Sequence, residues 1–530
     1  MAILGALRTG TLVLITVVLI SACSPAPAPA PVLTATPAPV STPTPGPPPE
    51  GILRVAVVGA APHQDLHRLI SEWATLFGAG LGYDRLFRFV ARPGTETPSL
   101  RVECDICLSW EFIDDATLDV DLHPAAWWQG ADDFESRQVA ALDVVWSLER
   151  MRKPGSPHER LLDSVDTIAV AGDRTVRFTL HYPDPDLLLK LASPYAVIMA
   201  PDALDRANLQ TGRVIGAGPW LFTRGGTGQV TLTARDDYFR DGEPVANSVQ
   251  FLPVADLITG VGLLGLDRAD MAQVSEQQWA EMDHELYGSV VIERQGRGVL
   301  FGANATRAPL RNRAVRQSIF RAIDPQLAIA ESFGVGWVGL GMPLLEPAWS
   351  LDQSNLAQAF VGPLAGIRAT LTLTIGNFGQ KYVSHGEELA AQLRDAGFII
   401  ATEVVSRGTY LERVWQQRDY DLFVGPMPPT DTPNAFALAM LHRGGTANVT
   451  GAGSDELDVL IDAFAVELNP AKRTILAEQL QTVALDGAWM FMVAGLSERW
   501  AFNDRVVDPP RAFPQGSGDW WKYTGVAKRL

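Results

Sequence analysis

Cysteine is scarce in this 530-residue sequence, which contains only three. Without a second cysteine pair, the chain lacks the ligand set of an ordinary structural zinc site. The signature patterns of P-loop nucleotide binding, zinc-dependent proteolysis and the serine nucleophile elbow are also missing. No catalytic set can be assembled from the sequence. We therefore expect a protein that is not an enzyme and that uses neither a metal nor a cofactor.

Two of the three cysteines, Cys104 and Cys107, lie close together within residues 102–108. The composition of this segment predicts a strand, whereas a redox-active cysteine pair is expected before a helix. In one straight strand the two side chains would point to opposite faces, so a disulfide would need a bulge or a turn. Two unpaired structural cysteines and a local disulfide therefore both stay open.

Two further patterns carry little weight. Gly334-Val-Gly-Trp-Val-Gly339 matches the dinucleotide-binding glycine pattern, but it follows a predicted helix over residues 323–333 rather than a strand. We expect a flexible glycine loop there. His63 and His67 are four residues apart and could share a helix face, but no third metal ligand lies near them in the sequence.

Positive charge is also in short supply, because 43 Lys and Arg stand against 60 Asp and Glu, which gives a formal net charge of −17. An acidic surface argues against nucleic acid as a partner and against direct adsorption to an anionic membrane. Hydrophobic residues make up 47% of the chain and charged residues 19%, as in a globular protein with a large core. The length predicts two or three lobes.

Long apolar runs are missing except near the start of the chain. Residues 11–20 are apolar, follow Arg8 and precede the small residues before Cys23. The run is too short for a comfortable membrane span, and its parts are those of a secretory signal. The position of Cys23 resembles the bacterial lipoprotein signal, which implies removal of residues 1–22 and lipidation of Cys23. An uncut anchor helix and plain secretion are the alternatives.

Residues 23–50 form the next distinct segment, with eleven prolines between Ser24 and Glu50. Proline fixes φ and lacks a backbone donor, so neither helix nor sheet is expected. Such a segment is a semi-rigid spacer that extends by about 3 Å per residue. We expect it to hold the globular body away from the membrane.

The body begins with a β-branched strand at residues 51–58, and strands alternate with turns over residues 106–122. Beyond residue 299 the apolar pattern changes to strands and helices in alternation. The expected elements are a strand at 370–375, a helix at 386–396, strands at 399–405 and 419–424, and a helix at 410–417. This alternation is typical of parallel βαβ units and predicts an α/β protein.

Several segments form a recognisable series along the chain. They are Leu53-Arg-Val-Ala-Val57, Tyr83-Asp-Arg-Leu-Phe87, Leu108-Ser-Trp-Glu-Phe-Ile-Asp-Asp115, Leu122-His-Pro-Ala-Ala-Trp-Trp-Gln-Gly130, Ala141-Leu-Asp-Val-Val-Trp-Ser-Leu-Glu-Arg150, Gly216-Ala-Gly-Pro-Trp220 and Val315-Arg-Gln-Ser-Ile-Phe-Arg-Ala-Ile-Asp324. In this order they resemble the extracellular solute-binding proteins of family 5. Members of that family are the peptide-, nickel- and oligosaccharide-binding subunits of ABC importers.

The resemblance implies a fold of the type II periplasmic-binding-protein kind, with two lobes, a hinge and an extra smaller domain. Domain I would comprise residues 51–85, 214–300 and 494–530. Domain II would comprise residues 86–213 and domain III residues 301–493. The crossings near Phe301 and Val493 would form the hinge, and hinge closure around a ligand is a common use of such an architecture.

The loop at residues 419–433 bears on the ligand. In peptide-binding relatives the matching loop carries an aromatic wall and an Asp that pairs with the α-amine of the peptide. Here Pro429 stands near that place, Asp431 follows two residues later, and Met427 lies near the position of the missing Trp. A buried ammonium needs a carboxylate partner, so either Asp431 takes over or the ligand has no free amine there. The ligand contacts that the resemblance implies are Gly59, Ala60, Gln273, Phe301, Met427, Thr430 and Asp431.

The sequence as a whole favours a binding subunit that captures a peptide or a similar small solute and delivers it to the permease subunits of an ABC importer. We expect a monomer on the outer face of the cytoplasmic membrane, bound to that membrane only through its lipid anchor, with no nucleic-acid partner. An extracellular hydrolase and a sensory or chaperone protein on the same fold are the alternatives.

Overall fold

The computed structural model describes residues 51–527 except 61–62, 98, 132–133, 205–213, 340–348, 350, 352–368, 429 and 431. The predicted signal sequence, Cys23, the proline-rich spacer and Asp431 therefore lie outside the described residues. The helices of the described part are all too short or too polar to cross a membrane.

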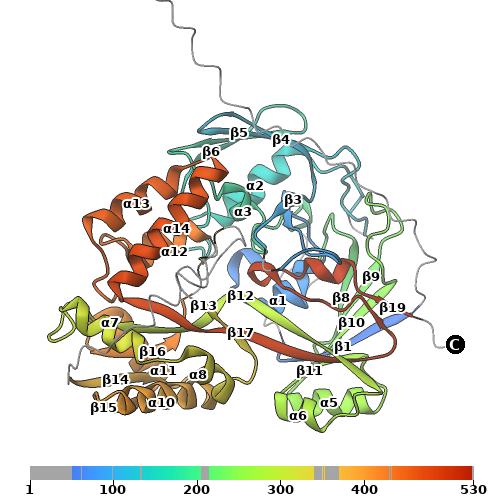
Figure 1. The fold of residues 1–530 in the computed structure, drawn as a ribbon. Helices are drawn as coiled ribbons and strands as arrows, with labels where there is room; N and C mark the ends of the chain where they lie inside the picture. Colours follow the sequence, from blue (N-terminus) through green and yellow to red (C-terminus); the bar gives the residue numbers. More distant parts are fainter. Residues whose placement is uncertain are drawn as a thin grey trace, which may run out of the picture. The chain divides into compact units, whose positions relative to one another are not determined.

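An eleven-stranded sheet runs through the described body (Figure 1). Its strands pair in the order β15-β14-β16-β12-β17-β11-β1-β10-β9-β8, and β13 also pairs with β17. The strands are β1 Ile52–Val58, β8 Trp220–Arg224, β9 Val230–Ala234, β10 Ser248–Val254, β11 Met271–Val274, β12 Tyr287–Ala303, β13 Gly336–Gly339, β14 Thr370–Gly376, β15 Ile399–Val405, β16 Leu422–Pro426 and β17 Met490–Asn503.

Two long strands, β12 and β17, connect the two halves of this sheet. They pair antiparallel with each other from Tyr287↔Asn503 to Gly302↔Met490. Toward one end β17 also pairs with β11, and toward the other β12 pairs with β16. Their register shifts between Glu293 and Gly298, so the ladder is interrupted where the chain passes from one half to the other.

Each half of the sheet contains parallel strands, and the alternation of strands and helices predicted them for the half beyond residue 299. β14 pairs parallel with β15 and β16, and β1 pairs parallel with β10 and β11. Along β14 the side chains of Leu371, Leu373 and Ile375 are buried, and α10 packs Leu389 and Leu393 into the same core. The helices of these regions are α1 Glu72–Leu76, α5 Leu257–Gly265, α6 Glu276–Glu281, α7 Arg313–Arg321, α8 Pro325–Ser332, α10 Gln380–Asp395, α11 Arg407–Tyr410, α12 Pro433–Phe436, α13 Asp455–Val466 and α14 Pro470–Gly487.

A second, four-stranded antiparallel sheet has the strand order β4-β5-β7-β6. Helix α2 packs against it because Val144, Leu148 and Met151 recur at helical spacing and are fully buried. The carboxylate of Asp143 accepts a hydrogen bond from the Ala140 N–H at 2.9 Å and so caps the first turn of α2. The elements here are β2 Phe87–Phe89, β3 Val102–Cys104, β4 Cys107–Asp114, β5 Thr117–Leu122, α2 Ala141–Met151, β6 Val165–Val170, β7 Thr175–Leu180, α3 Leu187–Leu191 and α4 Pro201–Leu204.

The two cysteines form a disulfide between separate strands, so the single strand predicted over residues 102–108 is wrong. Strand β3 ends at Cys104 and β4 begins at Cys107. The intervening Asp105 turns inward: its N–H donates to the Leu86 carbonyl at 2.9 Å, and its carboxylate accepts from the Arg85 N–H at 3.0 Å. This turn brings the two sulfur atoms together.

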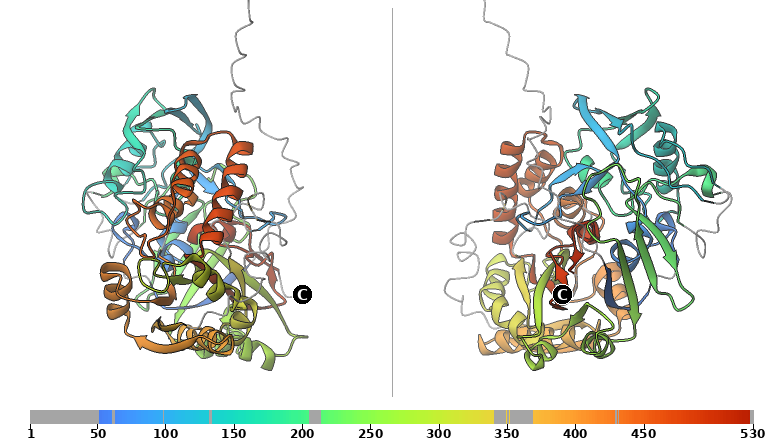
Figure 2. Two further views of the ribbon diagram at one scale, coloured as in Figure 1. Left: turned by 60° about the vertical axis from the view of Figure 1, so that its left-hand side comes forward. Right: turned by 90° about the vertical axis from the view of Figure 1, so that its right-hand side faces the viewer.

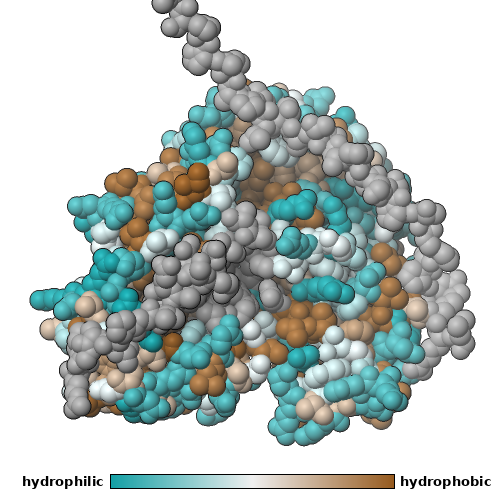
Figure 3. Space-filling model, viewed as in Figure 1, coloured by the Kyte–Doolittle hydropathy of each residue, from teal (hydrophilic) through white to brown (hydrophobic). Residues whose placement is uncertain are grey.

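The glycine-rich segment 334–339 is also not simply a loop. Its last four residues, Gly336–Gly339, form β13, which pairs with β17. Helices α13 and α14 lie side by side in both views of Figure 2 and share a buried core. On the face shown in Figure 3, hydrophilic side chains cover much of the described surface and the hydrophobic ones form small separate groups.

Candidate ligand-binding site

The carboxyl ends of β14, β15 and β16 meet at one edge of the sheet, which is where open α/β sheets commonly bind ligands. The Asn377 N–H, just beyond β14, donates to the Val405 carbonyl at the end of β15 at 2.9 Å. The guanidinium carbon of Arg407 lies 5.4 Å from the centre of the Phe378 ring. The Phe378 ring in turn lies 5.5 Å from the Tyr410 ring. An aromatic and a cationic side chain therefore stand together beyond these strand ends.

Two glycines lie at the carboxyl ends of these strands, Gly376 in β14 and Gly425 in β16, and the ring of Tyr410 packs against both. A Cβ atom at Gly376 would lie 2.9 Å from the Tyr410 ring, and one at Gly425 would collide with its hydroxyl group. The Tyr410 ring is fully buried, and burial raises the pKa of its hydroxyl group. Any larger side chain at Gly425 would displace this ring and with it the edge of the site.

Met427 and Thr430 follow β16, as the sequence predicted, but they differ in exposure. The side chain of Met427 is buried, and its N–H donates to the Gly298 carbonyl of β12 at 2.8 Å. The hydroxyl group of Thr430 is buried and forms no hydrogen bond to any described residue. A buried hydroxyl group without a partner is costly, so this oxygen is a candidate contact for a ligand.

The other predicted site residues lie elsewhere in the sheet. Gly59 and Ala60 are exposed just after β1, and Gly59 has a φ of +87° that favours glycine. Gln273 lies within β11 and is half-buried. Phe301 is fully buried in the core, with ring centroids 5.9 Å from Phe320 and 5.8 Å from Phe491. Its ring therefore serves packing in this structure.

An ion-pair cluster joins helix α1 to β12 at the interruption of the ladder. Glu72 accepts hydrogen bonds from Arg294 at 2.5 Å and from Arg297 at 2.9 Å, and Arg294 also donates to Glu498 of β17 at 3.0 Å. Burial raises the pKa of Glu72, but the two arginines outweigh it and hold this pKa below its ordinary value. Sequence reasoning missed this cluster because its partners are more than two hundred residues apart.

The two histidines considered as metal ligands serve other purposes. His63 Nδ1 accepts from the Asp65 N–H at 3.2 Å, and His67 Nε2 lies 3.0 Å from the Val197 carbonyl oxygen. Within the described ranges, no three His, Cys, Asp or Glu side chains gather closely enough to hold a metal ion.

Solved structures with this fold include HbpA2 from Haemophilus parasuis, with a TM-score of 0.76 and 18% identity, covering 91% of this chain and 100% of that one. Another is DppA from Helicobacter pylori in complex with the peptide STSA, with a TM-score of 0.68 and 17% identity, covering 91% of this chain and 99% of that one. At this identity the similarity establishes the fold, which is that of the type II periplasmic binding proteins.

Among curated proteins, the glutathione-binding protein GsiB of Pectobacterium atrosepticum is 28% identical over 225 residues, which are 42% of this chain and 43% of that protein. The chain spans about half or less of the length of the curated relatives it matches first. The model of the bacterial extracellular solute-binding proteins, family 5, middle region, matches residues 102–448. The chain therefore belongs to the extracellular solute-binding proteins of family 5.

Proposed function

We propose that this chain is the substrate-binding subunit of an ABC importer, which captures a small peptide or a similar solute and delivers it to membrane permease subunits. The observation that supports this function best is the passage of β12 and β17 between the two halves of the sheet, with an interrupted ladder between Glu293 and Gly298. Two connecting strands whose pairing is interrupted at the same place can act as a hinge, about which the two halves close around a ligand. Family membership and the glutathione- and peptide-binding relatives support the choice of ligand.

Closure of the body around its ligand is the direct test of this proposal. Small-angle X-ray scattering should show a smaller radius of gyration after addition of a peptide mixture, and mass spectrometry of the purified protein should identify the bound solute. The absence of compaction with every solute tried, together with chemical conversion of one of them, would contradict a binding protein and favour a hydrolase.

The ligand would contact the loop after β16, through Thr430 and Asp431. The unpaired hydroxyl group of Thr430 supports this placement. Replacement Thr430→Val should weaken peptide binding by about 3- to 10-fold, as expected for one lost hydrogen bond. Thr482→Val, on the exposed side of α14, is the matched control and should bind normally.

If Asp431 pairs with a peptide amine, Asp431→Ala should weaken peptide binding more than Thr430→Val does. Calorimetric titration measures the affinities of all three variants.

The proposed anchor is the lipidated Cys23 on the outer face of the cytoplasmic membrane. Replacement Cys23→Ser should abolish incorporation of radiolabelled palmitate and prevent cleavage of residues 1–22. The Cys104→Ser/Cys107→Ser variant keeps the acceptor and should be labelled like the wild type. Labelling of the Cys23→Ser protein, or normal cleavage of its signal sequence, would contradict the lipoprotein assignment.

A further inference from the structure

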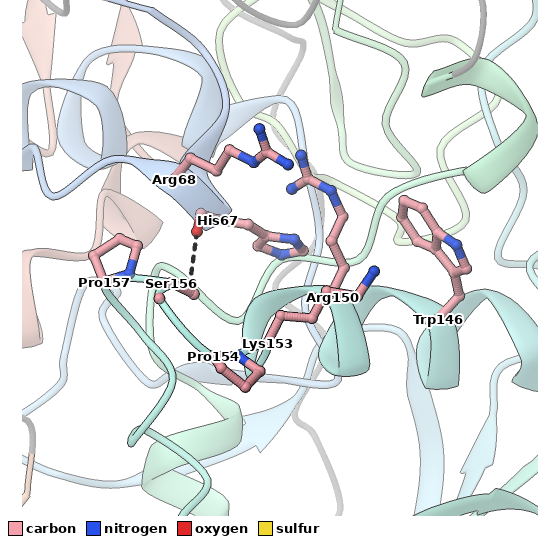
Figure 4. A pocket seen from close by; sticks show the side chains of 9 residues that line it. His67, Arg68, Trp146, Arg150, Lys153, Pro154, Ser156 and Pro157 are labelled. Atoms are coloured by element: carbon pink, nitrogen blue, oxygen red, sulfur yellow. Dashed lines mark hydrogen bonds between the residues drawn. The ribbon is translucent and has the colours of Figure 1, made fainter.

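A pocket of about 440 Å³ lies beside the short helix η1, Leu66–Arg68, and the last turn of α2. It is formed by elements other than those of the candidate ligand-binding site. Its lining residues are His67, Arg68, Trp146, Arg150, Lys153, Pro154, Gly155, Ser156 and Pro157 (Figure 4). Pockets that bind small molecules in proteins have volumes of about 300–1,000 Å³, so this one has room for a small organic molecule.

Positive charge gathers around this pocket although the chain as a whole is strongly acidic. Arg150 donates to both oxygens of Asp65, at 2.9 and 2.6 Å, and Arg68 lies 3.9 Å from the same carboxylate. Lys153 is exposed and has no ion-pair partner among the described residues. Glu159 is engaged by a backbone N–H of the pocket loop at 2.7 Å. Of the three cations that line the pocket, Arg68 and Arg150 share the carboxylate of Asp65, so an anion bound near Lys153 would balance the remaining positive charge.

The imidazole of His67 adds a hydrogen-bond acceptor between these cations (Figure 4). The ring is 1% exposed. Its Nε2 lies 3.0 Å from the Val197 carbonyl oxygen, which can only accept, so Nε2 carries the hydrogen. Nδ1 is then a bare acceptor, and it has no partner in the described structure. Burial and the charge of Arg150 lower the pKa of His67 to about 3, so the ring stays neutral.

We propose that this pocket binds a phosphate monoester, an oxyanion that also carries an O–H group. The cations attract the negative oxygens, and His67 Nδ1 accepts the hydrogen bond of the P–O–H group. The apolar faces of Trp146, Pro154 and Pro157 provide a wall for the organic part. A phosphate monoester has its second pKa near 6, so a large share carries the required proton in mildly acidic solution.

Isothermal titration calorimetry on the full chain at pH 6.0 and low salt tests this site with three probes: inorganic phosphate, glycerol 3-phosphate and sulfate. Both phosphates should bind saturably, and glycerol 3-phosphate should bind more tightly than inorganic phosphate. Sulfate should bind at least about tenfold more weakly, because it has no O–H group at this pH. Equal binding of sulfate and phosphate, or no saturable binding of either phosphate, would overturn the proposal.

Variants locate the binding within the pocket. Lys153→Gln removes an exposed, unpaired cation and should weaken binding of glycerol 3-phosphate about 3- to 10-fold, and Arg68→Gln/Lys153→Gln should weaken it further. Lys472→Gln, on the exposed surface of α14, is the matched control and should leave binding unchanged. Equal affinities of the Lys153→Gln and Lys472→Gln proteins would refute the assignment to this pocket.

The phosphate group could belong to a soluble ester or to a lipid headgroup. Vesicles containing phosphatidic acid present a monoester, and vesicles containing phosphatidylglycerol present a diester without a P–O–H group. Competition of phosphatidic acid vesicles with glycerol 3-phosphate would assign the site to a headgroup, and competition by neither vesicle would assign it to soluble esters. Equal competition by both vesicle types would contradict the role given to His67.

Discussion

Replacement Arg473→Gln is expected to destabilise the protein by about 3–5 kcal/mol, because it leaves a buried carboxylate without its cation. Arg473 of α14 donates to Asp186 at 2.5 Å, and the side chains are 8% and 0% exposed. The other oxygen of Asp186 accepts from the Asn434 N–H at 2.9 Å. The guanidinium of Arg473 also lies 4.5 Å from the centre of the Phe464 ring, a cation–π contact that glutamine would lose.

Urea-induced unfolding, followed by tryptophan fluorescence, measures this effect. Arg443→Gln is the control, because Arg443 also pairs with two aspartates but is 52% exposed, so its loss should destabilise the protein much less than the loss of Arg473. The double variant Asp186→Asn/Arg473→Gln removes both charges and should recover part of the lost stability. The losses of unfolding free energy of the single variants Asp186→Asn and Arg473→Gln are also measured. If the loss of the double variant equals their sum, the two charges are not coupled.

The same pair bears on the proposed closure. Asp186 lies in the predicted domain II and Arg473 in the predicted domain III, so their contact would hold these two domains together. If that assignment is right, the Arg473→Gln protein without ligand should have a larger radius of gyration than the wild type. Its affinity for the ligand should fall in proportion to the lost population of the closed state.

The parallel strands could be predicted because their signal is local. Apolar residues alternate or run together over β14, β15 and β16, and each strand ends at a change to polar residues or glycine. The two connecting strands could not be predicted at full length. Apolar residues occupy positions 290–292 and 299–303 of β12, but the segment between them, with Glu293, Arg294 and Arg297, has the composition of a polar loop. The charges of Arg294 and Arg297 are compensated by Glu72, a distant partner that no local pattern indicates.

The candidate site shows the same division. The resemblance to family 5 placed Met427 and Thr430 just beyond a strand, and the structure describes them there. The resemblance could not indicate that Phe301 packs into a cluster of aromatic rings, because the burial of Phe301 depends on Phe320 and Phe491 from other parts of the chain. The disulfide depended on the turn at Asp105, whose buried contacts are equally non-local.

A second large effect is expected for Lys522→Gln. The ammonium of Lys522 lies 3.2 Å from Asp105 and 3.9 Å from both Asp84 and Asp519, and all four side chains are almost completely buried. Burial and the neighbouring charge of Asp105 raise the pKa of Asp84 to about 7, whereas the positive charge of Lys522 lowers it. Removal of this cation leaves buried carboxylates undercompensated, and we expect a loss of about 3–5 kcal/mol at pH 8.

The pH dependence of this loss follows from Asp84. Its pKa of about 7 in the folded protein exceeds the value near 3.9 in the unfolded chain, so the folded state holds this proton more tightly. The stability contributed by this group is therefore full below about pH 4 and is lost as the pH rises to about 7. At pH 5.5 Asp84 is protonated and uncharged, so it gains less from the positive charge of Lys522. The Lys522→Gln replacement should therefore reduce the free energy of unfolding less at pH 5.5 than at pH 8.

Urea-induced unfolding at pH 5.5 and pH 8 measures this difference, with Lys472→Gln as the exposed control that should change little at either pH. Asp84→Asn keeps the shape of the protonated carboxyl group, so the Asp84→Asn/Lys522→Gln protein should be more stable at pH 8 than Lys522→Gln alone. Its loss of stability should also be nearly the same at the two pH values. A Lys522→Gln protein whose loss does not depend on pH would show that Asp84 is not the group that titrates, and the buried charge of Asp105 would then have to account for the whole effect.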